Sequence, residues 1–236
     1  MIALLSDIHG NLEALQAVLD DAHGRDIASF YCLGDTVGFG PDPRPCVEIV
    51  ESFDLCLAGN WDYFVAGNGE TDSRRAKSEL KFWYDWVRSE LSKSQLEFLQ
   101  SRPSINQRDG KTYAHGDPID TVNGYLFPES IYDRDKMRDI FAAFDGLFHC
   151  GHTHIGGVFT ESNFIESNQY DGRFAPESES AIINVGSVGQ PRDDDPRACY
   201  VVSYGDAYEF VRVPYDYETT RRKLDDLDPP GLARNK

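Results

Sequence analysis

Residues 1–11 of the chain read MIALLSDIHGN, and this stretch indicates the fold class. The short apolar run of residues 1–5 stops at a polar turn, which is typical of a buried strand. Residues 11–22 then carry leucine and valine at helical spacing, so we expect a helix to follow the strand directly. A buried strand followed at once by a helix is characteristic of α/β folds.

The same alternation continues along the first half of the chain. A strand is predicted over residues 30–33, a helix that begins with prolines over 43–52, and another strand over 55–58. This order favours a largely parallel sheet with helices outside it. Residues 73–100 are expected to be helical, with a break at 89–94.

Beyond Pro103 the pattern changes to short β segments. Helices are expected at 132–143 and 215–227, a polar surface excursion at 161–179, and a frayed tail at 228–236. We see no internal repeat and no interdomain linker, so residues 1–236 are predicted to form a single domain. Strands are predicted at 104–106, 111–114, 146–150, 157–160, 181–184, 199–203 and 207–213.

The composition limits the classes of partner. The chain has 236 residues, of which 40% are hydrophobic and 27% charged, so it is expected to be globular. Its 23 basic and 40 acidic residues give a net charge of −17, which argues against binding a polymeric nucleic acid or an anionic membrane. The five cysteines form no CxxC pair, which suggests reduced, packed thiols.

The sequence carries no sign of a membrane anchor or signal peptide. No apolar run approaches the ~20 residues that span a bilayer. The first residues have no basic segment and reach Asp7 too early for a signal peptide. We therefore expect a cytoplasmic protein.

Polar residues follow the predicted strands at the points where these strands end. Because the carboxyl ends of parallel strands meet at one edge of a sheet, we expect these residues to share one crevice. Neighbouring glycines let the backbone turn sharply there. The motifs are Asp7-Ile8-His9, Gly34-Asp35, Gly59-Asn60-Trp61-Asp62, His115-Gly116-Asp117 and Gly151-His152-Thr153-His154.

This set of donors is typical of a metal centre. Carboxylate, amide oxygen and imidazole together suit manganese foremost, with zinc, iron or nickel as alternatives. Seven donors are too many for one tetrahedral zinc, but they fill two sites if one carboxylate bridges. The predicted donors are Asp7, His9, Asp35, Asn60, His115, His152 and His154.

The order of the five motifs resembles that of calcineurin-like metallophosphoesterases, from residue 1 to about residue 200. Residues 184–192, NVGSVGQPR, resemble a segment of the small bacterial and archaeal phosphodiesterase-type branch. The resemblance implies a four-layer α/β/β/α sandwich, with two mixed sheets and flanking helices. It also implies two divalent ions, one held by Asp7, His9, Asp35 and His154, and the other by Asp35, Asn60, His115 and His152.

The third motif departs from the pattern of many family members. They have a histidine after the asparagine, credited with protonating the leaving group or contacting the phosphate, whereas this chain has Trp61. Asp62 cannot simply replace that histidine, because a carboxylate near two cations should be ionised and therefore a poor acid. The remaining candidates for catalytic roles are Asn60, Asp62 and Arg192. Asn11 is a further candidate for orienting water or phosphate.

Arg192 has two interpretations. Its planar guanidinium suits a substrate phosphate, but it could equally form a surface ion pair with an aspartate of the run 193–195. Among the other histidines, His23 is expected at the surface near a helix end, and His149 is expected to be packed within a strand. The aromatic residues 82–86 are expected in the core or at an interface.

The function expected from the motifs and the resemblance is hydrolysis of a small phosphate ester, a phosphodiester or phosphomonoester, by a hydroxide held by the metal pair. Two related alternatives are a phosphoprotein phosphatase and a dinucleotide polyphosphate hydrolase. An alternative of another class is a catalytically weak scaffold that binds a protein partner. Substrate, metal identity and oligomeric state stay open at this point.

Overall fold

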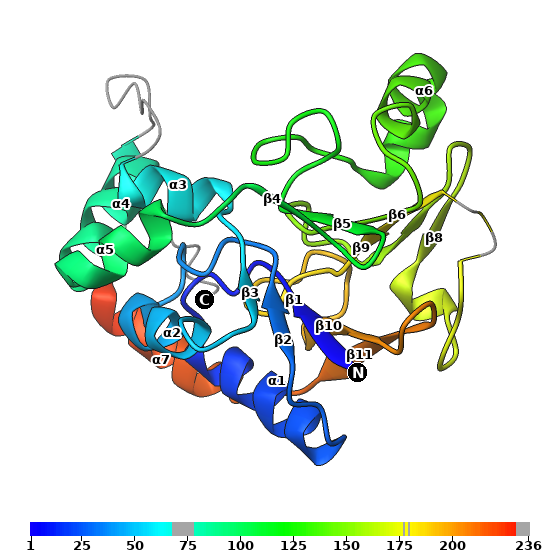
Figure 1. The fold of residues 1–236 in the computed structure, drawn as a ribbon. Helices are drawn as coiled ribbons and strands as arrows, with labels where there is room; N and C mark the ends of the chain where they lie inside the picture. The colour runs from blue at the N-terminus through cyan, green and yellow to red at the C-terminus, as the bar shows by residue number, and fades with distance from the viewer. Residues whose placement is uncertain (68–77, 177, 179, 230–236) are drawn as a thin grey trace.

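The computed structural model describes residues 1–67, 78–176, 178 and 180–229. Two mixed β-sheets pack face to face, and helices cover their outer faces (Figure 1). This arrangement confirms the predicted four-layer α/β/β/α sandwich. Within the described residues, no helix has both the length and the apolar character needed to cross a membrane.

The first sheet has five strands in the order β11-β10-β1-β2-β3. Strands β1, β2 and β3 are parallel to one another, whereas β10 and β11 are antiparallel to their neighbours. The sheet is therefore mixed rather than largely parallel, because the late strands β10 and β11 extend it at the β1 edge. Its strands are β1 (Ile2–Leu5), β2 (Phe30–Cys32), β3 (Leu55–Cys56), β10 (Ala198–Ser203) and β11 (Tyr208–Val213).

The second sheet has six strands in the order β4-β5-β6-β9-β7-β8. Its central strands β5, β6 and β9 are parallel, and the strands toward both edges are antiparallel. The strands are β4 (Ile105–Arg108), β5 (Lys111–Ala114), β6 (Leu147–Cys150), β7 (Gly157–Phe159), β8 (Phe164–Glu166) and β9 (Ala181–Asn184).

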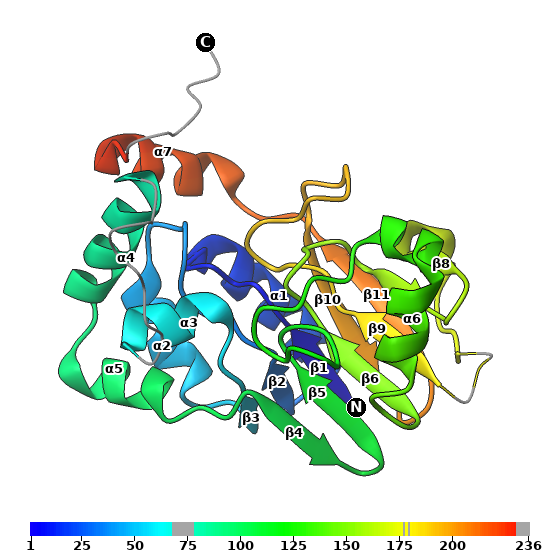
Figure 2. The same ribbon diagram turned by 90° about the horizontal axis from the view of Figure 1, so that it is seen from above.

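The helices lie on both outer faces of the pair of sheets (Figures 1 and 2). Helices α1 and α2 cover the first sheet, and α7 packs beside α1. Helix α6 covers the second sheet, while α3, α4 and α5 pack against one another. The helices are α1 (Leu12–Gly24), α2 (Pro43–Val50), α3 (Asn60–Ala66), α4 (Ser78–Glu90), α5 (Lys93–Gln100), α6 (Arg134–Phe141) and α7 (Tyr217–Leu227), with 3-10 turns at Pro128–Tyr132 and Ser167–Gln169.

Strand β1 contributes to two cores. Leu4 is fully buried between the two sheets, near Ile183 of the second sheet. Leu5 points to the opposite face and packs against α1 through Leu15 and Val18. Because successive side chains of a strand point to opposite faces, an apolar run of this kind is suited to a sheet buried on both sides.

Three details differ from the sequence predictions or lie outside the described residues. Residues 60–66 form helix α3, a helix for which the sequence analysis predicted no element. The predicted polar excursion contains strand β8, because Phe164 and Ile165 pair with β7. The predicted helical break at 89–94 is confirmed, but residues 73–77 of that predicted helix and residues 230–236 of the tail lie outside the description.

Candidate metal centre

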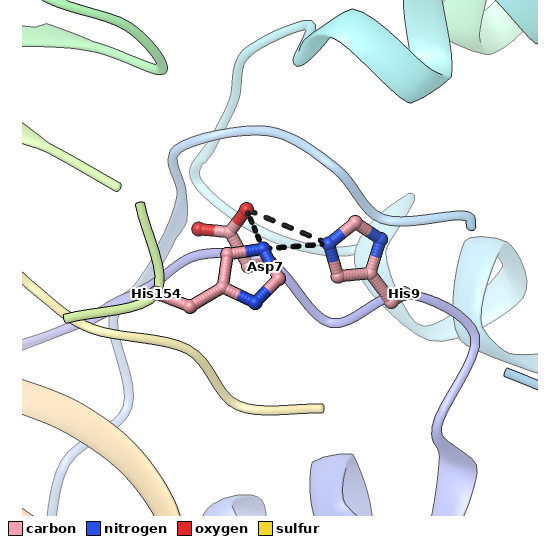
Figure 3. Close-up of side chains that lie close together, drawn as sticks. All are labelled: Asp7, His9 and His154. Carbon is pink, nitrogen blue, oxygen red and sulfur yellow. Dashed lines mark hydrogen bonds and ion pairs between the residues drawn. The ribbon is translucent and has the colours of Figure 1, made fainter. Parts of the chain in front are cut away.

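The first group of candidate ligands consists of Asp7, His9 and His154, whose side chains point toward one another (Figure 3). The Nε2 atoms of His9 and His154 lie 3.0 Å apart. Asp7 Oδ1 lies 3.2 Å from His154 Nε2 and 3.7 Å from His9 Nε2. One carboxylate and two imidazoles therefore face a common point, and this donor set suits a divalent first-row metal.

The second group consists of Asp35, His115 and His152, and all three residues are buried. His115 Nε2 lies 3.0 Å from His152 Nδ1 and 3.4 Å from Asp35 Oδ2. Asn60 Oδ1 lies 3.3 Å from the same His115 nitrogen, so the amide oxygen joins this group. These four residues are the set predicted for the second ion.

The two groups adjoin one another at Asp35. Its Oδ2 atom lies 3.4 Å from His115 Nε2 in the second group and 3.8 Å from His9 Nε2 in the first. Its other oxygen, Oδ1, accepts a hydrogen bond of 2.8 Å from the backbone N–H of Trp61. One oxygen is therefore fixed by the protein, and the other faces both groups as a bridging ligand would.

Two buried polar atoms of the site have no hydrogen-bond partner in the described part of the chain: Asp7 Oδ1 and His152 Nε2. A buried polar atom without a partner is costly, by about 1–3 kcal/mol, unless a ligand supplies the missing interaction. Asp7 Oδ1 faces His9 and His154, so a cation in the first group would supply its missing interaction. His152 presents Nδ1 to the second group, where a carboxylate, an amide oxygen and two imidazoles form a donor set that suits a cation. The residues present therefore fit a bound cation at each group.

Backbone carbonyls orient three of the imidazoles. A carbonyl oxygen only accepts hydrogen bonds, so each Nδ1 atom carries a hydrogen, and each ring in its neutral form has its lone pair on Nε2. The Nε2 atoms face the centre. Histidines that bind a metal are commonly oriented in this way, by a hydrogen bond from the other ring nitrogen to a carbonyl oxygen. The pairs of atoms are His9 Nδ1 and Val37 O at 3.3 Å, His115 Nδ1 and Leu33 O at 3.1 Å, and His154 Nδ1 and Gln190 O at 2.5 Å.

The backbone at the centre is held in an uncommon conformation. Five of the predicted ligands have positive φ, namely Asp7, His9, Asp35, His152 and His154, with values between 51° and 68°. Residues other than glycine rarely adopt such values, and each costs of order 1 kcal/mol or more. Backbone strain of this kind persists only where the surrounding structure enforces it, and it is found most often at functional sites.

Glycine is required where the turns approach the carboxylates. A Cβ atom at Gly59 would overlap Asp35 Oδ1, and one at Gly151 would overlap Ser6 Oγ and crowd Asp7 Oδ2. Both glycines belong to the predicted motifs. They allow the backbone to approach the carboxylate oxygens of Asp35 and Asp7 that accept backbone hydrogen bonds.

The charges at the centre favour a cation. Burial would raise the pKa of Asp35, but His115 and His9 lower it below its ordinary value. Burial would lower the pKa of His115, but Asp35 and Asp7 raise it to about 9. Burial, followed by the adjacent imidazole, lowers the pKa of His9 and of His152 to about 4. The two buried carboxylates thus attract positive charge, which a proton or a metal ion can supply.

Comparison with known proteins gives the family. Residues 1–207 match the sequence model of the calcineurin-like phosphoesterase superfamily domain. The chain belongs to the calcineurin-like phosphoesterase superfamily. This membership confirms the resemblance drawn from the five motifs, and it implies divalent metal ions at the two groups described above.

Similar proteins span almost the whole chain. An uncharacterized protein of Methanocaldococcus jannaschii is 36% identical over 233 residues, which is 95% of this chain and 91% of the archaeal protein. The crystal structure of a metallophosphoesterase from Sphaerobacter thermophilus shares 33% identity and a TM-score of 0.84, covering 98% of this chain and 94% of that one. A hypothetical protein from Pyrococcus horikoshii shares the fold, with 19% identity, a TM-score of 0.74, and coverage of 98% and 95%.

Trp61 occupies the position where many calcineurin-like phosphoesterases have a histidine. The indole is buried against an aromatic cluster, with ring centroids 4.4 Å from Phe39 and 4.7 Å from Tyr84. Its ring lies 6.2 Å from that of His9, edge to face. Trp61 therefore packs against the rim of the centre, and its backbone N–H positions Asp35.

Asp62 is fully buried but is held by the backbone. Its carboxylate accepts hydrogen bonds from the backbone N–H groups of Thr36, Val37 and Gly59, at 3.1–3.2 Å. Burial, and next the charge of Asp35, raise its pKa to about 7, whereas these donors favour the charged form. These bonds fix the turns that carry Asp35 and Asn60. A direct catalytic role of Asp62 stays a prediction.

Arg192 is exposed beside the centre. Its backbone N–H donates to the His154 carbonyl at 3.2 Å, and its guanidinium donates to Gln190 Oε1 at 2.9 Å. Within the run 193–195, Asp193 pairs with Arg212, and Asp195 pairs with Arg197. Contact between Arg192 and a substrate phosphate stays a prediction.

Asn11 has a structural role. Its Oδ1 accepts from the backbone N–H of Ala14, which caps α1, and its Nδ2 donates to the Gly189 carbonyl at 2.9 Å. Two other histidines are as predicted: His23 is exposed at the end of α1, and His149 is fully buried.

Sequence reasoning missed Tyr125, whose ring lies against the centre. The ring centroids of Tyr125 and His152 are 3.8 Å apart, and Tyr125 also stacks on Phe127 at 5.3 Å. Tyr125 lies in a loop between β5 and α6, ten residues beyond His115 in the sequence. No residue type or spacing marks it, because the contact forms only when the loop folds back over the second group.

Proposed function

We propose that the protein hydrolyses small phosphate esters at a centre of two divalent cations. The observation that carries the proposal is the pair of adjoining buried groups, Asp7, His9 and His154 beside Asp35, His115 and His152, with Asp35 facing both. Two adjoining sites that share a carboxylate are typical of hydrolases that cleave phosphate esters. The family membership supports the same class of reaction.

The chemistry supplied by the bound cations would be positive charge at a phosphoryl oxygen and a water of lowered pKa. The chain supplies the orientation. The carbonyls of Leu33, Val37 and Gln190 fix the imidazole rings, and the N–H of Trp61 fixes Asp35. Arg192, exposed next to Gln190, is the residue that we propose contacts the phosphate.

We propose that substrates with good leaving groups are favoured. No imidazole stands at position 61, and the buried indole of Trp61 cannot protonate a departing alkoxide. A positioned acid typically contributes about 10²–10⁴-fold to such a reaction. Activated diesters and aryl esters should therefore be cleaved faster than alkyl monoesters. We further propose manganese as the metal, since oxygen and imidazole donors are mixed.

The decisive experiment combines metal analysis with hydrolysis. Protein prepared with manganese should hold about two ions per chain and cleave bis(p-nitrophenyl) phosphate. Asp35→Asn should lose most of the bound manganese and most of the hydrolytic activity. Asp20→Asn, on the exposed side of α1, should retain the metal and the activity. Absence of bound metal together with absence of hydrolysis would refute the proposal and favour a protein-binding scaffold.

A further inference from the structure

A cavity of about 290 Å³ adjoins the metal centre on the side of His9. Its walls are mostly apolar and include Phe39, Pro191, Tyr215 and Leu224. None of the described residues that line it is an aspartate, glutamate, lysine or arginine. This is notable because the chain carries 63 such residues, 23 basic and 40 acidic, and a net charge of −17. The cavity therefore suits a neutral group rather than a phosphate.

The cavity borders the first group of ligands at His9. His9 contributes to both, because it lines the cavity while its Nε2 atom faces Asp7 and His154. The ring of Phe39 lies 5.6 Å from that of His9. Gln190 also lines the cavity, and its carbonyl orients the His154 ring. A molecule with its phosphoryl group at the centre could thus extend directly into the cavity.

Helix α7 forms the far wall and is firmly attached. It lies beside α1 and next to the loop that follows β9 (Figure 2). Thr220 donates to Asn11 Oδ1 at 3.1 Å, and Lys223 forms ion pairs with Glu13 and Asp42 at 2.5 Å and 2.7 Å. These bonds hold the cavity open, so binding would not require the helix to move.

We infer that this cavity binds a flat aromatic ring, an aryl group or a nucleobase, that is part of the phosphate ester substrate. The inference rests on the proposed function, since the phosphoryl group would lie at the metal centre. Three aromatic side chains, those of Phe39, Tyr215 and Tyr217, line the cavity, and aromatic rings pack best against other flat rings. The volume accommodates one ring system but not a folded partner.

Binding of two phosphonates, which cannot be hydrolysed, tests the inference. Calorimetry on the manganese-loaded protein should show that phenylphosphonate binds about tenfold more tightly than methylphosphonate, since burial of one aromatic ring is worth at least this factor. A second pair tests a nucleobase in the same way. Adenosine 5′-monophosphate and ribose 5-phosphate are compared as inhibitors of bis(p-nitrophenyl) phosphate hydrolysis, and a base that enters the cavity should make the first the stronger inhibitor. The pair that shows the preference identifies the ring.

Variants on α7 test whether the preference for ligands with an aromatic ring arises in this cavity. Leu224→Trp should fill the cavity and remove the preference without changing the affinity for methylphosphonate. Arg222→Trp adds the same side chain at an exposed position of the same helix and should retain the preference. Tyr217→Ala, at a residue that is 53% exposed, removes an aromatic wall without filling the cavity and should weaken the preference as well.

Each result has one meaning. Equal affinity of both members of each pair for the wild-type protein would overturn the inference, and so would a preference that survives in folded, metal-loaded Leu224→Trp. If Leu224→Trp does not fold, Tyr217→Ala decides in the same way. If bis(p-nitrophenyl) phosphate is hydrolysed while the preference is absent, the cavity inference fails and the proposed function stands. If neither phosphonate binds and no ester is cleaved, the proposed function itself fails.

Discussion

The carboxylate of Asp7 accepts a hydrogen bond from the backbone N–H of His152 at 2.9 Å. Asp7 follows β1 of the first sheet, and His152 follows β6 of the second. The bond therefore joins the two sheets at the metal centre. It leaves the other Asp7 oxygen facing His9 and His154. The same side chain thus fixes the turn before His154 and presents a ligand to the first group.

Gly59→Ala should disturb the candidate metal centre by displacing Asp35. The new Cβ atom would overlap Asp35 Oδ1, so the bridging carboxylate or the turn must shift. We expect a loss of about 1–3 kcal/mol in the free energy of unfolding, as for other overpacked sites, together with a lower manganese content. Urea denaturation and elemental analysis measure the two effects. Gly24→Ala is the control, because nothing lies within 4 Å of its added Cβ. Equal behaviour of both variants would contradict this account.

Trp61→His tests whether a missing acid limits the choice of leaving group. If the imidazole reaches the leaving oxygen, kcat/KM should rise by up to about 10²-fold for alkyl esters and change little for p-nitrophenyl esters. The measurement is kcat/KM across a series of leaving groups.

The alternative for Trp61 is a purely packing role. Because the indole contacts Phe39 and Tyr84, its loss could loosen the turn that carries Asn60. Trp61→Phe keeps an aromatic ring but adds no acid, so it should show no selective gain for alkyl esters. A uniform loss across the series in Trp61→His would rule out the missing-acid account.

Tyr125→Ala should weaken metal binding at the second group. The Tyr125 ring packs on His152 at 3.8 Å and restricts the orientation of that imidazole. Loss of a residue that orients a ligand typically costs about 10–100-fold in metal affinity. Titration of manganese against a competing chelator should show this loss for one of two ions. Tyr132→Ala, at a residue that is 83% exposed, should leave both affinities unchanged. An unchanged titration in Tyr125→Ala would show that the ring has no such role.

His149 should make the fold sensitive to acid. Its Nδ1 donates to the Thr112 carbonyl at 3.2 Å, so Nε2 accepts the Tyr208 hydroxyl at 3.0 Å and the ring is neutral. Burial lowers the pKa of His149 to about 3, below its ordinary value of 6.5. As pH falls below about 6.5 the unfolded chain gains a proton that the folded protein excludes, so stability is present above this pH and is lost toward pH 3.

The size of this effect can be stated for one site. Between pH 7 and pH 5, His149 should account for a loss of about 2 kcal/mol in the free energy of unfolding. Denaturant titrations at both pH values should show that His149→Gln is less stable at pH 7 but loses about 2 kcal/mol less than wild type on acidification. His23→Gln, at an exposed histidine, is the control. Parallel pH profiles of wild type and His149→Gln would disprove the assignment.

The sequence could place the candidate ligands together because their positions follow from local sequence. Asp7 and His9 come directly after an apolar strand, as do Asp35 and His152, and the topology of parallel strands brings strand ends together. The structure brings all of these residues to one centre. Their positive φ values could not be read from the sequence, since the short side chain of aspartate and the ring of histidine occur in many conformations.

Other features depend on contacts that local sequence does not encode. Helix α3 begins at Asn60 because Asp62 accepts the N–H of Gly59, and the sequence of this segment fits a turn equally well. Strand β8 lies in a polar region and is specified mainly by its pairing with β7. The wall that Leu224 gives to the cavity arises from packing of α7 on α1, two segments at opposite ends of the chain.

The division of ligands between the sheets has a mechanical consequence. The first group takes Asp7 and His9 from the end of β1 in the first sheet and His154 from beyond β6 in the second. The second group combines Asp35, which follows β2 of the first sheet, with His115 and His152, which follow β5 and β6 of the second. An ion in either group would cross-link the two sheets, because it would be bound by residues from both. Neither sheet alone supplies all the candidate ligands of either group. Loading of the centre would therefore report that the two sheets have docked, and separating the sheets would first have to break bonds between the metal and its ligands.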